Sequence, residues 1–343
     1  MKIIIATDAW SPQVNGVVRT YENMQREIEA MGHELRIIHP GEFKTIPCPS
    51  YPSIRLAIFP GKGIARIIEE FAPDAIHVAT EGPVGHAARK YCLSHGIPFT
   101  TSYHTQFPEY IRARAPIPLN TSYAYMRRFH GAAERTYVPT KHMKQLLEKK
   151  GFENIVIWSR GVNRQIFKPG DKNFLDLPRP IYVYMGRVAV EKNIEAFLNM
   201  SLQGTKLVVG DGPDLEKLKS QYPDVHYTGY KFGEELARYI AASDVFVFPS
   251  LTDTFGIVLL EAMACGIPVA AYPVTGPIDV VKQGVSGIID DDLEKACKAA
   301  IDLNPQDCVN YASTYSWQNS AQTFVDNLAI IHSASYNHKT VTQ

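Results

Sequence analysis

Apolar and polar positions follow two different periods along the chain. Short apolar runs have the length and composition of buried strands, among them KIIIAT (residues 2–7), SIRLAIF (53–59) and IYVYMG (181–186). Between residues 16 and 31 the apolar positions recur mostly at spacings of three and four, which is typical of a helix that covers a sheet. Because strand and helix patterns alternate, the sequence predicts an α/β protein with parallel sheets and helical crossovers.

The alternation breaks between residues 160 and 180, where glycines and prolines punctuate a polar stretch. A chain of 343 residues is longer than one hydrophobic core usually supports, which favours two domains over a single large barrel. We therefore predict two Rossmann-like, doubly wound domains that face each other across a cleft, over residues 1–162 and 163–316. The amphipathic segment 317–332 needs a surface to cover, and we expect it to pack back on the first domain.

Composition and charge exclude several classes of protein. Hydrophobic residues make up 45% of the chain, and 35 basic side chains balance 35 acidic ones, so the charge does not indicate a nucleic-acid partner. No run approaches the roughly 18 apolar residues that span a bilayer, and the first residues lack the architecture of a signal peptide, so we expect a cytoplasmic protein. The five cysteines show no CxxC spacing and predict neither a disulfide framework nor a zinc site.

A pair of carboxylates stands at the start of one predicted helix. The segment PSLTDTFGIVLLEAMACGIPVAAYP places Asp253 at a strand-to-helix turn and Glu261 eight residues later, so that both can face the cleft. Between them, Phe255 and Gly256 present backbone N–H groups suited to hydroxyls or anions. Taken alone, such a pair is usually a helix cap and a solvated helix residue.

This segment resembles the Glu-x7-Glu signature of the family-four retaining glycosyltransferases, which adopt the GT-B fold. Here Asp stands in place of the first Glu, which shortens the side chain by one methylene. The resemblance implies that Glu261 binds the ribose hydroxyls of a nucleotide sugar. It also implies that the donor hexose is contacted by Asp253 and by the residues that follow it, Thr254, Phe255, Gly256 and Ile257.

Two cations follow the first strand of the second predicted domain. In VYMGRVAVEKN, Arg187 and Lys192 lie on a short loop, where they resemble the family's phosphate-binding Arg and Lys. Fixed cations there would neutralise the charge that grows on a departing diphosphate. The alternative is a pair of surface cations. Without a DxD metal motif, and with residues 290–292 expected to be loop acids or a helix start, we predict that no metal or other cofactor is required.

Two segments of the first predicted domain also point toward the cleft. Asn15 and Gly16 form a turn between the first strand and helix, and His104 ends a later strand in TSYHTQFPEY. A plain turn and a structural histidine are the alternatives. The resemblance implies that the Gly16 loop flanks the diphosphate and the acceptor, and that His104 helps to position the donor without acting as a base.

Further segments extend the resemblance over about residues 1–332. RGVNRQIFKP is similar to the family's hinge motif, VVGDGPDLEKLK to a glycine turn that includes Gly212, and the backbone near Tyr230 and Lys231 to the segment that reads the nucleobase. In the retaining family the leaving phosphate oxygen helps to deprotonate the acceptor, so no protein nucleophile is needed. The enzyme's task would be positioning and charge stabilisation.

The acceptor is indicated by a basic and aromatic stretch at residues 110–130. Such a face suits an anionic membrane surface as well as it suits a solvated pair of basic helices. The segments DAWSPQVNGVVRT and HTQFPEY also resemble those of bacterial enzymes that glycosylate diacylglycerol and of the related mannosyl- and sulfoquinovosyltransferases. The candidate acceptor and membrane residues are Asn15, Tyr110, Arg112, Arg114, Arg127 and Arg128.

The sequence therefore predicts a retaining hexosyltransferase that carries a hexose from a UDP-sugar to a membrane lipid such as diacylglycerol, at the inner face of the plasma membrane. A GDP-mannose-dependent α-mannosyltransferase is the alternative within the same class. A sugar-nucleotide epimerase and a non-catalytic nucleotide-sugar binder are alternatives from other classes. A dinucleotide oxidoreductase is disfavoured because the first strand-turn lacks GxGxxG.

Overall fold

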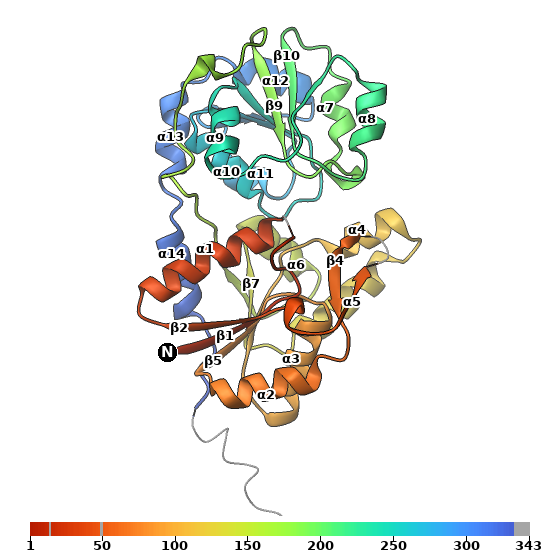
Figure 1. Ribbon diagram of the computed structural model, residues 1–343, viewed down its shortest axis with the longest axis vertical. Coiled ribbons are helices and arrows are strands. Elements are labelled where there is room, and N and C mark those ends of the chain that lie inside the picture. Colours follow the sequence, from red (N-terminus) through yellow and green to blue (C-terminus); the bar gives the residue numbers. More distant parts are fainter. Residues whose placement is uncertain (14, 49–50, 333–343) are drawn as a thin grey trace, which may run out of the picture.

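The computed structural model describes residues 1–13, 15–48 and 51–332, without the side chains of residues 51–53, 113 and 114. It has two lobes, each built around a six-stranded parallel sheet (Figure 1). The strand orders are β2-β1-β5-β6-β7-β8 and β11-β10-β9-β12-β13-β14. In each sheet the first strand along the chain lies inside the sheet, and later strands are added first on one side of it and then on the other. This is the doubly wound arrangement, and it confirms the predicted α/β class over the single barrel.

The N-terminal lobe holds the first sheet, and its apolar strands are covered on both faces by helices. The strands are β1 (Lys2–Ala6), β2 (Glu34–Ile38), β5 (Ala75–Val78), β6 (Thr100–Ser102), β7 (Arg135–Val138) and β8 (Ile155–Ile157). The helices are α1 (Gly16–Ala30), α2 (Gly61–Phe71), α3 (Pro83–His95), α4 (Phe107–Arg114), α5 (Leu119–His130) and α6 (Lys141–Lys149), with the short 3-10 turn η1 (Pro40–Glu42).

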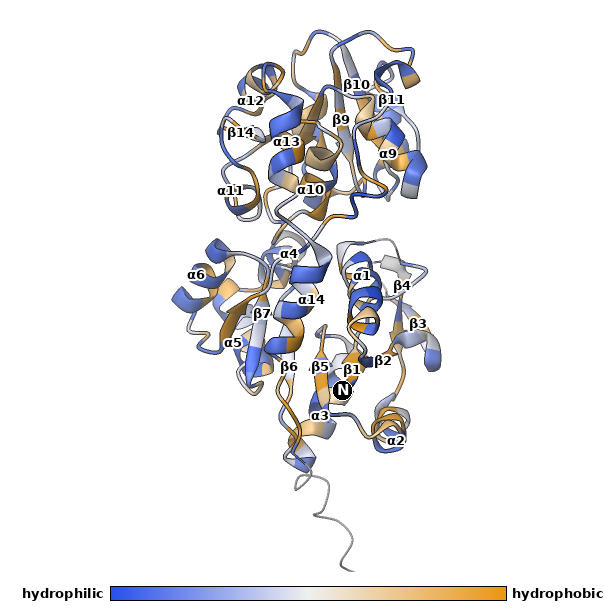
Figure 2. Ribbon diagram, turned by 90° about the vertical axis from the view of Figure 1, so that its left-hand side faces the viewer, coloured by the Kyte–Doolittle hydropathy of each residue, from blue (hydrophilic) through white to orange (hydrophobic). Residues whose placement is uncertain are grey.

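The helix predicted over residues 16–31 is α1, and the spacing of its apolar residues explains its burial. Val18, Tyr21, Met24 and Ile28 are buried against the sheet, whereas the residues between them face outward. Figure 2 shows the general form of this pattern, with apolar strands inside both lobes and polar helix faces outside.

One predicted strand lies outside the parallel sheet. SIRLAIF does contain a strand, β4 (Tyr51–Ala57), but it pairs antiparallel with β3 (Thr45–Cys48) in a separate two-stranded ribbon. The prediction that it joins the parallel sheet was wrong. The two strands are too close in sequence for a parallel pairing, which needs a crossover of a dozen or more residues.

The C-terminal lobe holds the second sheet. Its strands are β9 (Ile181–Met185), β10 (Thr205–Val209), β11 (His226–Tyr227), β12 (Val245–Phe248), β13 (Val269–Ala271) and β14 (Gly287–Ile289). Its helices are η2 (Lys172–Phe174), η3 (Val190–Lys192), α7 (Ile194–Leu198), α8 (Leu215–Gln221), α9 (Gly233–Ala241), α10 (Ile257–Ala264), α11 (Pro277–Val280), α12 (Leu293–Ala300) and α13 (Pro305–Ala312).

The last helix, α14 (Trp317–Asp326), crosses back from the C-terminal lobe to the N-terminal lobe, where it lies beside α1 (Figures 1 and 2). The indole of Trp158 donates to the carbonyl of Ser320 at 3.0 Å, and the ring of Phe324 packs against Trp158 with centroids 5.0 Å apart. The chain therefore passes between the lobes twice, and both connections restrain how the lobes sit.

Candidate active site

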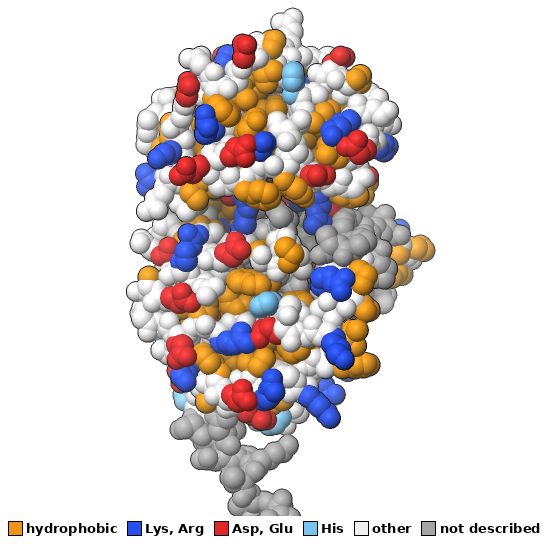
Figure 3. Space-filling view, viewed as in Figure 1, with side chains coloured by type: hydrophobic (Ala, Val, Ile, Leu, Met, Phe, Trp, Pro, Cys, Tyr) orange, Lys and Arg blue, Asp and Glu red, His pale blue; other side chains and the backbone are white. Residues whose placement is uncertain are grey.

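A cavity of about 540 Å³ lies between the two lobes. Its walls come from the ends of strands β1, β6, β9 and β12 and from the turns that follow them, which are the carboxyl ends of both sheets. Figure 3 shows the indentation between the lobes from one side, with Lys and Arg side chains within it. The fold thus brings the two halves of the chain together at the place where the sequence indicated a cleft.

Most of the predicted site residues line this cavity, and a few do not. Gly212 and Glu261 are not among its lining residues, nor are the predicted membrane residues Arg112, Arg127 and Arg128, and the side chain of Arg114 lies outside the described residues. The predicted residues that line it are Asn15, Gly16, His104, Tyr110, Arg187, Lys192, Tyr230, Lys231, Asp253, Thr254, Phe255, Gly256 and Ile257.

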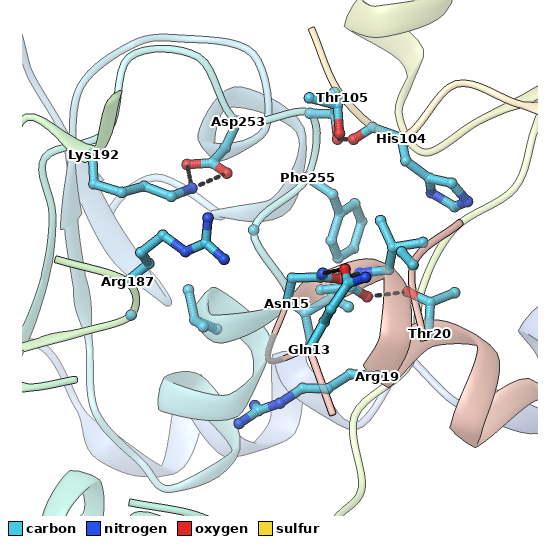
Figure 4. A pocket seen from close by; sticks show the side chains of 18 of the residues that line it. Gln13, Asn15, Arg19, Thr20, His104, Thr105, Arg187, Lys192, Asp253 and Phe255 are labelled. Carbon is cyan, nitrogen blue, oxygen red and sulfur yellow. Dashed lines mark hydrogen bonds and ion pairs between the residues drawn. The ribbon is translucent and has the colours of Figure 1, made fainter. Parts of the chain in front are cut away.

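Lys192 and Asp253 form a closely spaced ion pair on the C-terminal side of the cavity (Figure 4). The ammonium of Lys192 lies 2.6 and 2.9 Å from the two carboxylate oxygens. Burial opposes the charge on Lys192, but the neighbouring carboxylate outweighs it and raises the pKa of the lysine above its ordinary value. Arg187 lies beside this pair in Figure 4, on a loop fixed by a hydrogen bond from the hydroxyl of Tyr184 to the Arg187 carbonyl at 2.6 Å.

Glu261 does not line the cavity, and it forms an ion pair with Arg19 that the sequence did not predict. One carboxylate oxygen is 2.7 Å from the guanidinium of Arg19, which reaches across from α1 of the other lobe. The second oxygen is buried without a hydrogen-bond partner. Burial raises the pKa of Glu261, and Arg19 opposes that shift. Asp253 therefore lines the cavity directly, whereas Glu261 faces the other lobe and contacts Arg19, which lines the cavity.

His104 is held by the protein through both ring nitrogens. Nδ1 lies 3.2 Å from the guanidinium of Arg160, which can only donate, so Nδ1 accepts and the proton sits on Nε2. Nε2 in turn donates to the hydroxyl of Tyr21 at 2.9 Å. Burial, and then the charge of Arg160, lower the pKa of His104 well below its ordinary value. The imidazole is thus a neutral, fixed group, and the backbone carbonyl of His104 accepts a hydrogen bond from Thr254 at 2.7 Å.

Arg160 is a cavity residue, but no role was predicted for it from the sequence, because it appeared only as the first residue of the segment RGVNRQIFKP. Its side chain lines the cavity although the residue is only 4% exposed, and it stacks on Trp158 with 4.0 Å between guanidinium carbon and ring centroid. It donates to the carbonyls of Trp158 and Ser159 and to His104. No Asp or Glu in the described part of the chain forms an ion pair with it. Burial lowers the pKa of Arg160 to about 10, so it stays charged at neutral pH.

Asn15 has a structural task in addition to lining the cavity. Its side-chain oxygen accepts hydrogen bonds from the backbone N–H groups of Val17 and Val18, both at 3.0 Å, and so caps α1. The cap holds the N-terminus of this 15-residue helix at the cavity, next to Gly16, where the helix dipole favours a negative group.

Two family models match the chain, one in each lobe. Residues 14–166 match Glycosyltransferase Family 4, and residues 179–304 match Glycosyl transferases group 1, so that together the matches span most of the chain. The chain belongs to the family-four glycosyltransferases. The glycosyltransferase class and the enzyme class predicted from Asp253, Glu261, Arg187 and Lys192 are thereby confirmed.

Relatives of this glycosyltransferase include three enzymes matched over most of its length. A GDP-mannose-dependent alpha-mannosyltransferase of Corynebacterium glutamicum is 29% identical over 88% of this chain and 79% of the relative. The sulfoquinovosyl transferase of Arabidopsis thaliana is 28% identical over 96% and 69%, respectively. The alpha-monoglucosyldiacylglycerol synthase of Acholeplasma laidlawii is 25% identical over 89% of each chain.

Solved structures of similar shape support the GT-B fold of this glycosyltransferase. The sucrose-phosphate synthase of Thermosynechococcus elongatus matches with a TM-score of 0.76 at 18% identity, over 95% of this chain and 97% of that one. The Anabaena protein HepE, in complex with UDP and glucose, matches with a TM-score of 0.70 at 15% identity, over 95% and 98%. The predicted fold of two facing Rossmann-like domains is confirmed.

The acidic run of the glycosyltransferase at residues 290–292 starts a helix, one of the two structures that the sequence allowed for it. Asp292 caps α12 by accepting from the backbone N–H of Lys295 at 3.0 Å, and Asp290 pairs with the ammonium of the same lysine at 2.6 Å. In residues 1–13, 15–48 and 51–332 no group of three or more His, Cys, Asp or Glu residues is placed to hold a metal ion.

Gly212 serves the glycosyltransferase through backbone contact rather than as a cavity wall. A Cβ at this position would lie 2.2 Å from the carbonyl oxygen of Val188, closer than any side chain tolerates. The glycine lets the turn after β10 pack against the loop that carries Arg187, and so it acts on that loop indirectly.

Proposed function

We propose that this glycosyltransferase moves a hexose from a nucleotide sugar, a UDP-hexose, to the hydroxyl of a membrane lipid such as diacylglycerol, with retention of the α-configuration. The observation that carries the proposal is the convergence of Arg187, Lys192, Arg160 and the N-terminus of α1 on one cavity. Three cations and a helix dipole in a water-poor space are suited to a departing diphosphate.

Same-face transfer without a protein nucleophile is supported by the state of the two carboxylates. Both oxygens of Asp253 are engaged by Lys192, and Glu261 lies below the cavity wall. Neither is presented as a nucleophile toward the sugar. The proposed roles are therefore donor positioning for His104 and Asp253, charge stabilisation for Arg187 and Lys192, and nucleotide binding for Tyr230, Lys231 and, after it exchanges its partner Arg19, Glu261.

We further propose that residues 1–162 form the acceptor-binding domain and residues 163–316 the donor-binding domain. The first sheet ends at Ile157 and the second begins at Ile181, so this boundary lies in the segment that connects them. Tyr110 lines the cavity from the first of these domains and Phe255 lines it from the second.

A lipid acceptor is supported by the surface next to the cavity as well as by the relatives. On α4 and α5 the side chains of Ile111, Leu119 and Tyr125 are exposed, by 36%, 36% and 52%, near the arginines that the sequence singled out. None of the helices in the described residues is long and apolar enough to cross a membrane. The proposed attachment is peripheral, through Arg112, Arg127, Arg128 and the exposed apolar residues beside them, with Arg114 outside the described side chains.

GDP-mannose is the second candidate donor, because GDP-mannose-dependent mannosyltransferases are among the relatives and match this chain over both lobes.

The choice between the two donors is tested by incubating the protein with a panel of UDP- and GDP-sugars and a membrane lipid extract, followed by mass spectrometry of the lipids. A hexosyl lipid formed from a UDP-sugar supports the first proposal, and a mannosyl lipid formed from GDP-mannose supports the second. Conversion of the donor without any glycosylated product would contradict both and favour an epimerase.

A further inference from the structure

Glu81 lines the acceptor side of the cavity and was not among the residues singled out by the sequence. Its position is fixed by the start of α3. The carboxylate of Asp8 accepts from the backbone N–H groups of Val84 and Gly85 at 2.8 and 3.1 Å, which satisfies the first turn of that helix. Gly82 makes room for this contact, since a Cβ there would lie 2.4 Å from the carboxyl carbon of Asp8.

The side chain of Glu81 is held from one side only. One carboxylate oxygen accepts from Nε2 of His130 at 3.1 Å, and Nδ1 of His130 accepts from the hydroxyl of Thr101 at 2.9 Å. His130 is fully buried and the Glu81 side chain is 6% exposed. Its second oxygen has no hydrogen-bond partner among the described residues. This oxygen is not among the fully buried unpaired atoms, so it is open to the cavity, and an unpaired carboxylate oxygen on a cavity wall is a site for a hydrogen-bond donor on a ligand.

The charge around Glu81 defines what kind of ligand fits. Three of the cations that line the cavity are already paired with other acids: Arg19 with Glu261, Lys192 with Asp253, and Lys231 with Glu235. No lysine or arginine in the part of the chain that the structure describes forms an ion pair with Glu81. A phosphate group would meet uncompensated negative charge at this end of the cavity, whereas a hydroxyl would find an acceptor.

We infer that Glu81, oriented by His130, binds a hydroxyl of the acceptor and selects uncharged head groups over phosphorylated ones. The inference rests on the proposed function. During transfer the bond between the sugar C1 and the leaving phosphate oxygen breaks and the bond to the acceptor oxygen forms. The proton of the acceptor hydroxyl goes to the leaving phosphate. Glu81 gains and loses no proton in this step, and it acts by binding and specificity.

The test compares Glu81→Gln with the wild-type enzyme in mixed micelles, with dioleoylglycerol as the neutral acceptor and phosphatidylglycerol as the anionic one. We expect the KM for dioleoylglycerol to rise at least about tenfold in Glu81→Gln, because a hydrogen bond to a charged acceptor is lost. We expect the preference for the neutral lipid over the anionic one to shrink. The KM for the donor and the slow hydrolysis of donor in the absence of lipid should stay within about twofold, since neither uses Glu81. Glu134→Gln, which changes an exposed carboxylate outside the cavity, is the matched control.

An unchanged KM for dioleoylglycerol in Glu81→Gln, from a wild-type enzyme that makes the glycolipid, overturns this inference and leaves the proposed function standing. A parallel loss of donor hydrolysis also overturns it, because Glu81 would then support the fold of the cavity and not the acceptor. A wild-type enzyme that glycosylates neither lipid with any donor contradicts the proposed function itself.

Discussion

Individual charged side chains in the cavity are partnered across long distances in the sequence, and the partners define their tasks. Asp253 holds Lys192, Arg19 holds Glu261, and Arg160 holds His104 without an acid of its own. A buried charge that lacks a counterion is costly unless a ligand supplies one. The unneutralised arginine therefore marks the place where we expect the diphosphate to bind.

Lys192→Ala is expected to lower turnover by at least about a hundredfold, because it removes a fixed positive charge from the departing diphosphate. The measurement is kcat with the donor and acceptor identified by the panel experiment. Lys217→Ala is the matched control, since Lys217 makes an ion pair with Glu195 on the exposed surface of the same lobe. Near-normal turnover in Lys192→Ala would refute its role.

Arg160→Met is expected to change the pH profile as well as the rate. Burial and the charge of Arg160 both lower the pKa of His104, so removing that charge raises the pKa toward its ordinary value. As the pH falls, His104 then becomes protonated at a higher pH than in the wild type, and the acid limb of kcat/KM moves upward. Arg164→Met, at an exposed position, serves as the control. Superimposable normalised profiles of Arg160→Met and wild type between pH 5 and 8 would contradict a positioning role.

At the scale of elements, the apolar spacing predicted α1 and an amphipathic last helix, because both depend on local periodicity. It could not place β3 and β4, since a strand pattern does not specify which strand it pairs with. The same limit applies to site residues. Asp253 and Lys192 stand in recognisable motifs, whereas the Arg19–Glu261 contact joins residues 242 positions apart and carries no local signal.

Phe324→Ala is expected to reduce the free energy of unfolding by about 3–5 kcal/mol, the usual cost of truncating a buried phenylalanine. Phe324 is fully buried and packs on His77, Tyr137 and Trp158 of the N-terminal lobe. The measurement is urea unfolding followed by tryptophan fluorescence, with Gln322→Ala on the exposed face of the same helix as control. An effect no larger than that of Gln322→Ala would mean that α14 does not support this lobe in solution.

At the scale of the whole molecule, side-chain contacts join the two lobes at several points, and in the described part of the chain three of them are shorter than 3.0 Å. These are the Arg19–Glu261 ion pair, the hydrogen bond from Thr254 to the His104 carbonyl, and the pair formed by His142 with Asp279 at 2.9 Å. Two of the three involve residues or segments of the proposed donor site. We therefore expect closure of the lobes to be coupled to occupation of that site.

A double-mutant cycle tests the first of these contacts. Arg19→Met should destabilise the wild-type protein by about 3 kcal/mol, because it leaves a buried carboxylate without its counterion. In a Glu261→Gln background the same change should cost much less, since no charge is then stranded. Urea unfolding of the four proteins gives the coupling energy. Equal losses in both backgrounds would show that the ion pair does not hold the lobes together.

The central claim is that the cavity carries out same-face transfer in which no protein group attacks the sugar. Proton NMR of the anomeric signal of the glycolipid, made by the wild-type enzyme from an α-linked nucleotide hexose, tests it most directly. Same-face transfer gives an α-linked product throughout the reaction. A β-linked product, or a covalent hexosyl adduct on Asp253 detected by mass spectrometry of the enzyme during turnover, would contradict it.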